Sequence, residues 1–277
     1  MQKAYICGAC AAQFPPSDEP PSACPICLDE RQFVPVAGQS WTTLDQVAKR
    51  YANQYRQYEP GLMGIGTVPQ FCIGQRALLV KTPEGNFLWD CVTLLDDATI
   101  EIVKGLGGLA GIAISHPHYY TTMADWSHAF DEAPIYLHED DRKWVTRPNA
   151  NIQFWDGDTK TLADGLTLIR CGGHFAGGTV AHWDKGGNGK GALFTGDIVM
   201  VIPDRNYVSF MRSYPNLIPL SGPSVERLGR MLEPYDYDVI YGAFFDRNVT
   251  KGAKQAVQKS VKRYVAAVTG DGSRELQ

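Results

Sequence analysis

Short apolar runs separated by turn signals recur along most of the chain and predict alternating strands and helices. Runs rich in β-branched and aromatic residues predict strands at 77–80, 87–92, 111–115, 135–138, 152–155, 166–170, 179–183, 192–195 and 239–243. Apolar residues at helical spacing and capping residues predict helices at 43–58, 96–104, 119–130, 140–146, 223–232 and 251–268. No internal repeat of a solenoid period is present. Helices mixed with many short strands indicate a layered α/β protein.

Composition and charge exclude several classes of protein. The chain has 277 residues, 44% of them hydrophobic, which is enough for a sizeable core. Its 26 Lys and Arg against 30 Asp and Glu give a net charge of −4, so nothing favours a nucleic acid or an anionic membrane as partner. The first ten residues lack a signal-peptide core, and the run 105–115 is about half of a bilayer span. We expect a cytoplasmic protein with a small-molecule substrate, and the oligomeric state stays open.

Four of the seven cysteines lie in the first 27 residues, as two C-x-x-C pairs. Cys7 and Cys10 form the first pair, and Cys24 and Cys27 form the second after a Pro-rich stretch (13–22) predicted to be a loop. Two such turns complete a tetrahedral four-thiolate site, and so short a segment needs a metal to fold. The segment resembles a zinc ribbon or the two knuckles of a rubredoxin. Zinc is favoured, iron also fits four thiolates, and a closed site of this kind predicts a structural role.

The chain therefore divides into two predicted domains. Residues 1–38 form the four-cysteine knuckle, residues 36–40 are a linker, and residues 39–277 carry their own core. The other three cysteines are predicted to be small packing residues. They are Cys72, Cys91 and Cys171.

Three histidines and one aspartate occur where predicted strands end. His116 and His118 form an H-x-H directly after the strand 111–115, His174 lies in a glycine-rich loop, and Asp197 follows the strand 192–195 in a T-G-D. Side chains at such strand ends converge at the rim of a sheet sandwich. Three imidazoles and one carboxylate suit zinc or ferrous iron.

The order of these motifs resembles the metallo-β-lactamase superfamily, from about residue 61 to the C-terminus. The resemblance implies a four-layer αβ/βα sandwich preceded by the small zinc-ribbon-like domain. It also implies metal binding by His116, His118 and His174, with Asp197 either completing the metal shell or holding a water. Asp90, after the strand 87–92, is similar to the acidic residue that ends an early strand in that family.

Three ligands of a second metal are missing together. The family motif H-x-H-x-D-H has Tyr120 in place of its aspartate and Thr121 in place of its last histidine. The late strand is followed by Gly-Ala-Phe-Phe (242–245) and no histidine. We therefore expect a single metal ion beside the strand ends, with Tyr120 as a candidate hydrogen-bond donor to an oxyanion.

The resemblance implies a metal-dependent hydrolase with a reduced, mono-metal site that activates water on an ester, lactone, thioester or similar substrate. Two alternatives stay open. One is a mono-iron enzyme similar to the sulfur-oxidising dioxygenases of this superfamily, for which a rubredoxin-like knuckle suggests electron transfer. The other is a non-catalytic, metal-stabilised binding or sensing protein.

Candidate substrate contacts follow the T-G-D strand, where a loop is expected to overhang the metal. The loop 205–216 supplies Arg205, Tyr207, Arg212 and Tyr214, and Phe175 is a candidate apolar wall. No phosphate-binding glycine-rich loop is predicted, because the segment 61–66 lacks the spacing and the lysine of a P-loop.

Overall fold

The computed structural model describes residues 2–270. A seven-stranded sheet forms one half of the sandwich, in the order β10-β9-β8-β7-β6-β5-β4. Strands β4 to β7 are antiparallel, whereas β7 to β10 are parallel. The strands are β4 (Ala52–Glu59), β5 (Leu62–Val68), β6 (Arg76–Thr82), β7 (Gly85–Trp89), β8 (Gly111–Ala113), β9 (Ile135–His138) and β10 (Ile152–Trp155).

A six-stranded sheet forms the other half, in the order β11-β12-β13-β14-β19-β20. It is antiparallel except for the parallel pair β14 and β19. The strands are β11 (Thr159–Ala163), β12 (Leu166–Arg170), β13 (Thr179–Trp183), β14 (Ala192–Phe194), β19 (Val239–Tyr241) and β20 (Asn248–Val249). Two small ribbons follow, β15 (Met200–Val201) with β16 (Val208–Ser209) and β17 (Met211–Ser213) with β18 (Ile218–Pro219).

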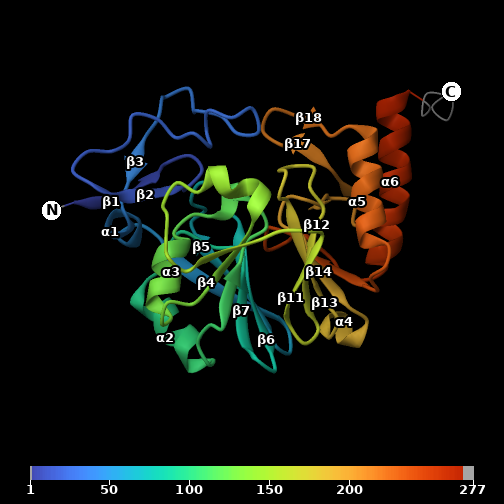
Figure 1. Ribbon diagram of the computed structural model, residues 1–277, viewed down its shortest axis with the longest axis horizontal. Helices are drawn as coiled ribbons and strands as arrows, with labels where there is room; N and C mark the ends of the chain where they lie inside the picture. The colour runs from blue at the N-terminus through green and yellow to red at the C-terminus, as the bar shows by residue number, and fades with distance from the viewer. Residues whose placement is uncertain (1, 271–277) are drawn as a thin grey trace.

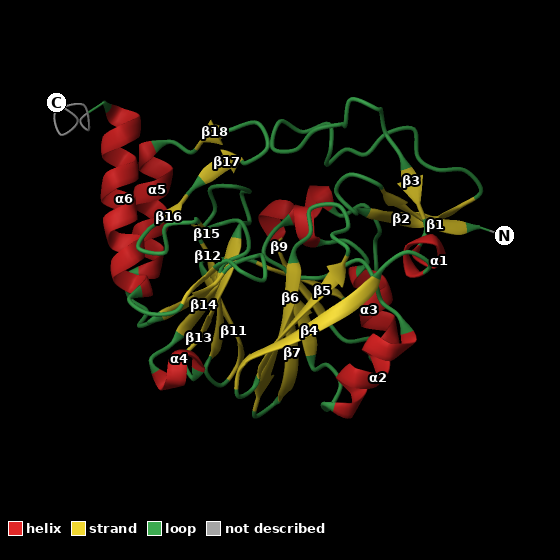
Figure 2. Ribbon diagram, turned by 180° about the vertical axis from the view of Figure 1, so that it is seen from behind, coloured by secondary structure: helices red, strands yellow, loops and turns green. Residues whose placement is uncertain are grey.

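Helices cover the outer face of each sheet, so the molecule has four layers (Figure 1; from behind in Figure 2). On the seven-stranded side lie α2 (Asp97–Gly105), capped by Asp96, and α3 (Met123–Ala129). On the other side lie α5 (Gly222–Leu232), capped by Ser221, and α6 (Ala253–Thr269). A third apolar cluster, which includes Leu78 and Phe194, fills the space between the sheets. The predicted αβ/βα sandwich is confirmed.

The predicted helix 43–58 is largely wrong. Only α1 (Leu44–Ala48) is helical, and the following residues form β4. Tyr51 and Tyr55 do recur at helical spacing with Leu44, but tyrosine also suits strands, and β5 provides a partner that pairs with β4 from Ala52 onward. The available partner strand overrides the weak local preference for a helix.

Two further predicted helices are shorter than expected. The segment 119–130 begins as a 3₁₀ turn (Pro117–Tyr119) and becomes α-helical only at Met123. The segment 140–146 is a 3₁₀ helix over Glu139–Trp144. Another short helix, α4 (Gly186–Gly189), went unpredicted. Among residues 2–270, no helix combines the length and the apolar character that a membrane crossing requires.

Residues 2–42 form a small module around a three-stranded sheet in the order β2-β1-β3. Its strands are β1 (Lys3–Cys7), β2 (Gln13–Ser17) and β3 (Trp41–Thr42). The expectation of a loop at 13–22 is wrong for β2, whose prolines are tolerated because the strand lies at the edge of the sheet. Strand β3 extends this sheet to Thr42, four residues beyond the expected end of the knuckle at 38. We call residues 2–42 the four-cysteine module.

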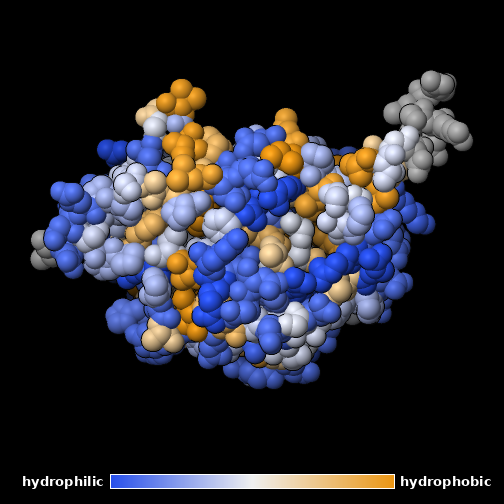
Figure 3. All heavy atoms as spheres, turned by 45° about the horizontal axis from the view of Figure 1, so that its top comes forward, coloured by the Kyte–Doolittle hydropathy of each residue, from blue (hydrophilic) through white to orange (hydrophobic). Residues whose placement is uncertain are grey.

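The four-cysteine module lies over the edge of the sandwich beside β17 and β18 (Figure 1). Hydrophobic residues gather on its surface (Figure 3). The exposed ones are Leu28, Phe33, Val34 and Val36.

Candidate metal centre

Four ligand side chains come together where strands of both sheets end. His116 and His118 follow β8, His174 lies in the loop between β12 and β13, and Asp197 follows β14. One ligand atom from each residue lies within 4.8 Å of the others. We call these four residues the histidine site. The sequence predicted each member, and the fold brings them together.

Distances within the histidine site fit a tetrahedral metal ion. His116 Nε2 lies 3.6 Å from Asp197 Oδ2, and His118 Nδ1 lies 3.3 Å from His174 Nε2. Donor atoms about 2.0–2.1 Å from a tetrahedral zinc are about 3.3 Å apart, so these separations match. His116 Nε2 is buried and has no hydrogen-bond partner within residues 2–270, as expected of an atom that binds a metal. The residues present fit a metal ion.

Hydrogen bonds to the remaining atoms of three ligands fix their orientation. Ser115 Oγ lies 2.8 Å from His116 Nδ1. His174 Nδ1 lies 3.1 Å from the carbonyl oxygen of Met211, to which it donates. The Tyr119 hydroxyl donates to Asp197 Oδ1 at 2.7 Å. Such partners set the histidine tautomer and orient the ligands toward a metal.

The electrostatics of the histidine site keep its ligands in the forms that bind metals. Burial, together with the neighbouring histidines, lowers the pKa of His118 well below its ordinary value. Burial likewise lowers the pKa of His174 to about 3. Burial opposes ionisation of Asp197, but its interactions with His116, His174 and Tyr119 hold its pKa below the ordinary value. His118 and His174 are therefore neutral imidazoles and Asp197 is a carboxylate at neutral pH, which are the forms that bind metals.

Asp90 supports the histidine site through the main chain that precedes His116. Its carboxylate accepts a hydrogen bond from the Ser115 amide at 2.8 Å, directly before His116. Burial raises the pKa of Asp90 to about 7. Its backbone has a positive φ of 59°, an uncommon conformation for a residue other than glycine.

Tyr120 lies in the hydrophobic cluster between the seven-stranded sheet and its helices, with 3% of its surface exposed. The neighbouring phenol, Tyr119, is the one that reaches Asp197, because the 3₁₀ turn 117–119 directs it there. The Thr121 hydroxyl is buried and has no partner within the described residues. Tyr119, rather than Tyr120, is thus the phenol that donates to a residue of the histidine site, and the donor role toward an oxyanion expected of Tyr120 stays a prediction.

The four candidate substrate residues lie in different places. Only Tyr214 reaches the histidine site: its hydroxyl donates to the main-chain oxygen of Asp197 at 3.0 Å. Arg212 pairs with Glu30 of the four-cysteine module. Arg205 donates to the main-chain oxygens of two loop residues, Ile202 and Asp246. Tyr207 packs against Lys259 and Arg263 of α6. The expectation that Arg205 and Tyr207 overhang the metal is wrong, because these contacts engage them elsewhere.

The four N-terminal cysteines form a second candidate metal site. All four are buried and free of disulfides. Cys7 Sγ lies 3.5 Å from Cys27 Sγ, and Cys10 Sγ lies 3.6 Å from Cys24 Sγ. A disulfide is about 2.05 Å long, whereas thiolates on one tetrahedral zinc are about 3.8 Å apart. The donor set and spacing fit one metal ion.

Two of the three remaining cysteines, Cys91 and Cys171, are buried in the two helix-covered cores as expected. Cys72 instead lies beside the four-cysteine module, where its thiol contacts the main-chain oxygens of Cys7 and Gly8.

Sequence reasoning missed the residue that joins the two sites. Arg31, four residues after Cys27, is 8% exposed, and its guanidinium lies 4.0 Å from the centre of the Phe175 ring. Phe175 in turn contacts all three histidine rings, at centroid distances of 4.9–5.6 Å. The only available signal was the clustering of charged residues directly after the second C-x-x-C pair.

Comparison with known proteins identifies the relatives of this chain. No protein-family model matches it. It is 48% identical over 269 residues to "Uncharacterized protein YmaE" of Bacillus subtilis (strain 168), covering 96% of this chain and 97% of YmaE. The chain belongs to the YmaE family.

Solved structures show that this YmaE-family chain has the metallo-β-lactamase fold. The DIM-1 metallo-β-lactamase superposes with a TM-score of 0.57 at 16% identity, over 79% of this chain and 98% of that one. A B3 metallo-β-lactamase with an active-site glutamic acid gives a TM-score of 0.55 at 14% identity, over 84% and 96%. VMB-1 gives 0.58 at 12% identity, over 78% and 97%. At these identities the likeness extends to the fold alone.

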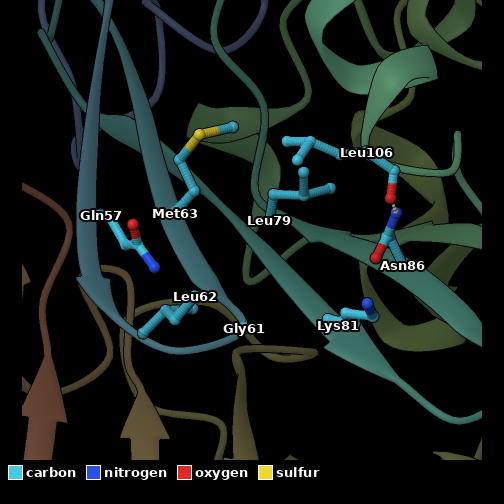
Figure 4. A pocket seen from close by; sticks show the side chains of 8 residues that line it. All are labelled: Gln57, Gly61, Leu62, Met63, Leu79, Lys81, Asn86 and Leu106. Carbon is cyan, nitrogen blue, oxygen red and sulfur yellow. Dashed lines mark hydrogen bonds between the residues drawn. The ribbon is translucent and has the colours of Figure 1, made fainter.

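One well-formed cavity of this YmaE-family chain lies away from both metal sites. It has a volume of about 220 Å³ and opens on the face of β4 to β6 (Figure 4). Its lining is mainly apolar and contains none of the metal ligands. The lining residues are Gln57, Gly61, Leu62, Met63, Leu79, Lys81, Asn86 and Leu106.

Proposed function

We propose that the protein is a metal-dependent hydrolase in which one metal ion at the histidine site activates water for attack on an ester, lactone, thioester or similar small molecule. The observation that carries this proposal is the convergence of three imidazoles and one carboxylate, with His116 Nε2 buried and unpaired within the described residues. The metallo-β-lactamase fold places this set at the strand ends of both sheets.

A bound zinc or ferrous ion would supply a Lewis acid and would lower the pKa of a water molecule toward neutrality. The protein residues have separate tasks. His116, His118 and His174 would hold the ion, with Ser115 and the Met211 carbonyl orienting two of the rings. One carboxylate oxygen of Asp197 faces His116, and the other accepts a hydrogen bond from Tyr119. Asp197 can therefore either complete the set of metal ligands or accept a proton from the nucleophile.

The residues beside the histidine site support a single ion there. Tyr120 is packed in the core, and Thr121 offers only a neutral hydroxyl. The late loop after β19 presents Ala243 and Phe244 in place of a ligand, and both belong to the same apolar cluster. None of these four residues offers a carboxylate or an imidazole to a second ion. We therefore propose two metal ions per chain, one at each site.

Activity on a panel of esters, lactones, thioesters and phosphodiesters tests the hydrolase proposal. His116→Ala should reduce turnover at least 100-fold, because it removes a ligand, and should lower the metal content by one ion per chain. His128→Ala is the matched control, since His128 is an exposed surface histidine paired with Glu132. Equal turnover in both variants would refute a role for the histidine site in hydrolysis.

Metal analysis of protein purified without added metal tests the number and identity of the ions. Anomalous scattering at the zinc and iron edges should show one ion at each site. Iron at the histidine site together with dioxygen consumption would favour the mono-iron alternative. A second ion beside Tyr120 and Thr121 would contradict the mono-metal proposal.

A further inference from the structure

Arg31 is held rigidly between the four-cysteine module and the sandwich. Its guanidinium makes a paired interaction with the Asp29 carboxylate, with one N–H···O distance of 2.7 Å. It lies 4.0 Å from the ring centre of Phe175 and 4.9 Å from that of Trp144. A guanidinium stacks well on aromatic faces, and such contacts strengthen when water is excluded.

The aromatic partners of Arg31 connect the two metal sites. Trp144 packs against the apolar cluster that contains the four cysteines, and its ring meets Phe175 edge-on at 5.7 Å. Phe175 is 1% exposed and contacts the rings of His116, His118 and His174. The cysteine cluster and the three histidine rings are thus joined by two aromatic side chains, and Arg31 stacks on both.

The backbone around Arg31 is fixed to the strand that orients His174. Ser213 Oγ donates to the Arg31 carbonyl at 3.2 Å, and Asn216 Nδ2 donates to the carbonyls of Glu30 and Gln32 at 2.9 and 3.0 Å. Ser213 belongs to β17, whose first residue, Met211, accepts the hydrogen bond from His174. Displacement of the Arg31 segment would therefore disturb the support of His174.

The side chains that form the histidine site are buried, since its four ligands are between 1% and 6% exposed. Arg31 and its segment lie against Phe175 and β17, the two elements that support the ligands from the side of the four-cysteine module. The firmness with which these neighbours hold the ligands in place is therefore expected to affect how fast a bound metal ion is released.

We propose that Arg31 is a positioning residue of the histidine site: by clamping Phe175 against the three histidines, it makes retention of the histidine-site metal depend on a folded four-cysteine module. The proposal concerns metal retention and does not depend on which reaction the site performs. Because Cys27 lies four residues before Arg31, a metal on the four thiolates sets the position of the clamp.

The release of cobalt(II) to an excess of chelator tests this proposal. Cobalt on thiolates gives a strong near-ultraviolet charge-transfer band that cobalt on imidazoles and a carboxylate lacks, so this band reports the four-cysteine site alone. The total cobalt transferred to the chelator, minus the cobalt lost from that band, gives the release from the histidine site. Arg31→Ala should release histidine-site cobalt at least tenfold faster than the unaltered protein, with the thiolate band preserved. Arg31→Lys should fall between the two, because an ammonium keeps the charge but cannot stack or pair as a planar group.

Arg142→Ala is the matched control. Arg142 also pairs with a nearby carboxylate, Glu139, and stacks on an aromatic ring, Phe154 at 3.6 Å, but does so at an exposed position. Its release rate should stay within twofold of the unaltered protein. Asp29→Asn provides a second test that retains the Arg31 side chain, and it should also accelerate release. The proposal is overturned if the Arg31 and Asp29 variants that fold release histidine-site cobalt within twofold of the unaltered rate.

Discussion

The hydrogen bond from Tyr119 to Asp197 is expected to control how tightly the histidine site binds its metal. Tyr119→Phe removes one oxygen atom and leaves the ring in place. The hydroxyl is fully buried and donates to Asp197 Oδ1 at 2.7 Å. Without it, this carboxylate oxygen loses a donor in a region that water cannot readily reach.

The loss of metal affinity in Tyr119→Phe can be worked out from the kind of hydrogen bond that is removed. A hydrogen bond to a charged group contributes about 1.5–3 kcal/mol. Loss of an orienting partner of a metal ligand typically lowers metal affinity about 10- to 100-fold. Because 1.4 kcal/mol corresponds to about a tenfold change in a binding constant, the two ranges agree. We expect Tyr119→Phe to weaken metal binding at the histidine site by about 10- to 100-fold.

The assay is a competition titration of cobalt(II) or zinc against a chelator of known affinity. Tyr214→Phe is the matched control, since the Tyr214 hydroxyl is part-buried beside the same residue but donates to the main-chain oxygen of Asp197 rather than to its carboxylate. It should change the affinity less than threefold. Equal affinities for the Tyr119 variant and the unaltered protein would refute the assignment of Tyr119 as the residue that orients Asp197.

Two further predictions concern the four-cysteine module and a buried carboxylate. Cys24→Ser should lose the metal of the four-cysteine site, because it removes one of the four thiolate ligands. Metal binding supplies about 10–16 kcal/mol to the folding of comparable small modules, so hydrogen exchange measured by mass spectrometry should become fast over residues 2–42. Protection there equal to that of the unaltered protein would contradict this prediction. Asp141 accepts a hydrogen bond from the Gly177 amide, and burial raises its pKa to about 6 from an ordinary value of 3.8. The folded protein therefore binds this proton more tightly than the unfolded chain, so stability should fall as the pH rises from about 4 to about 6, by at most about 3 kcal/mol. Urea unfolding of the unaltered protein and of Asp141→Asn should show this loss as a change in their difference between pH 4.5 and pH 7.5, and a difference independent of pH would contradict the shifted pKa.

Many of the strands and the candidate metal ligands could be predicted because their signals are local, whereas the αβ/βα sandwich was implied by the resemblance of the motif order to the metallo-β-lactamase superfamily. The H-x-H of 116–118, the glycine-rich loop around His174 and the T-G-D ending at Asp197 each lie beside a strand with a clear apolar pattern. The prediction of a helix at 43–58 was wrong because most of this segment forms β4. Strand β4 depends on pairing with β5, a contact between separate segments that the local pattern does not show.

Long-range packing also explains which site residues the sequence could not identify. Tyr119 and Tyr120 are adjacent tyrosines, and only the turn at 117–119 decides which of them faces Asp197. The role of Arg31 depends on docking of the four-cysteine module against Phe175, 144 positions further along the chain. The charged residues that follow the second C-x-x-C pair are a local signal, but they do not identify so distant a partner.

Burial gives a physical reason why the missing second-metal ligands are replaced together. Tyr120, Thr121 and Ala243 are each 3–4% exposed, next to a cluster of apolar side chains. An aspartate or histidine at these positions without a cation would be a polar or charged group removed from water with no compensating partner, at a cost of several kcal/mol. Apolar or neutral residues at these positions avoid that cost where no second ion is bound. The unpaired hydroxyl of Thr121 is the polar group that remains at this position, and a neutral hydroxyl costs far less to bury than an unpaired imidazolium or carboxylate.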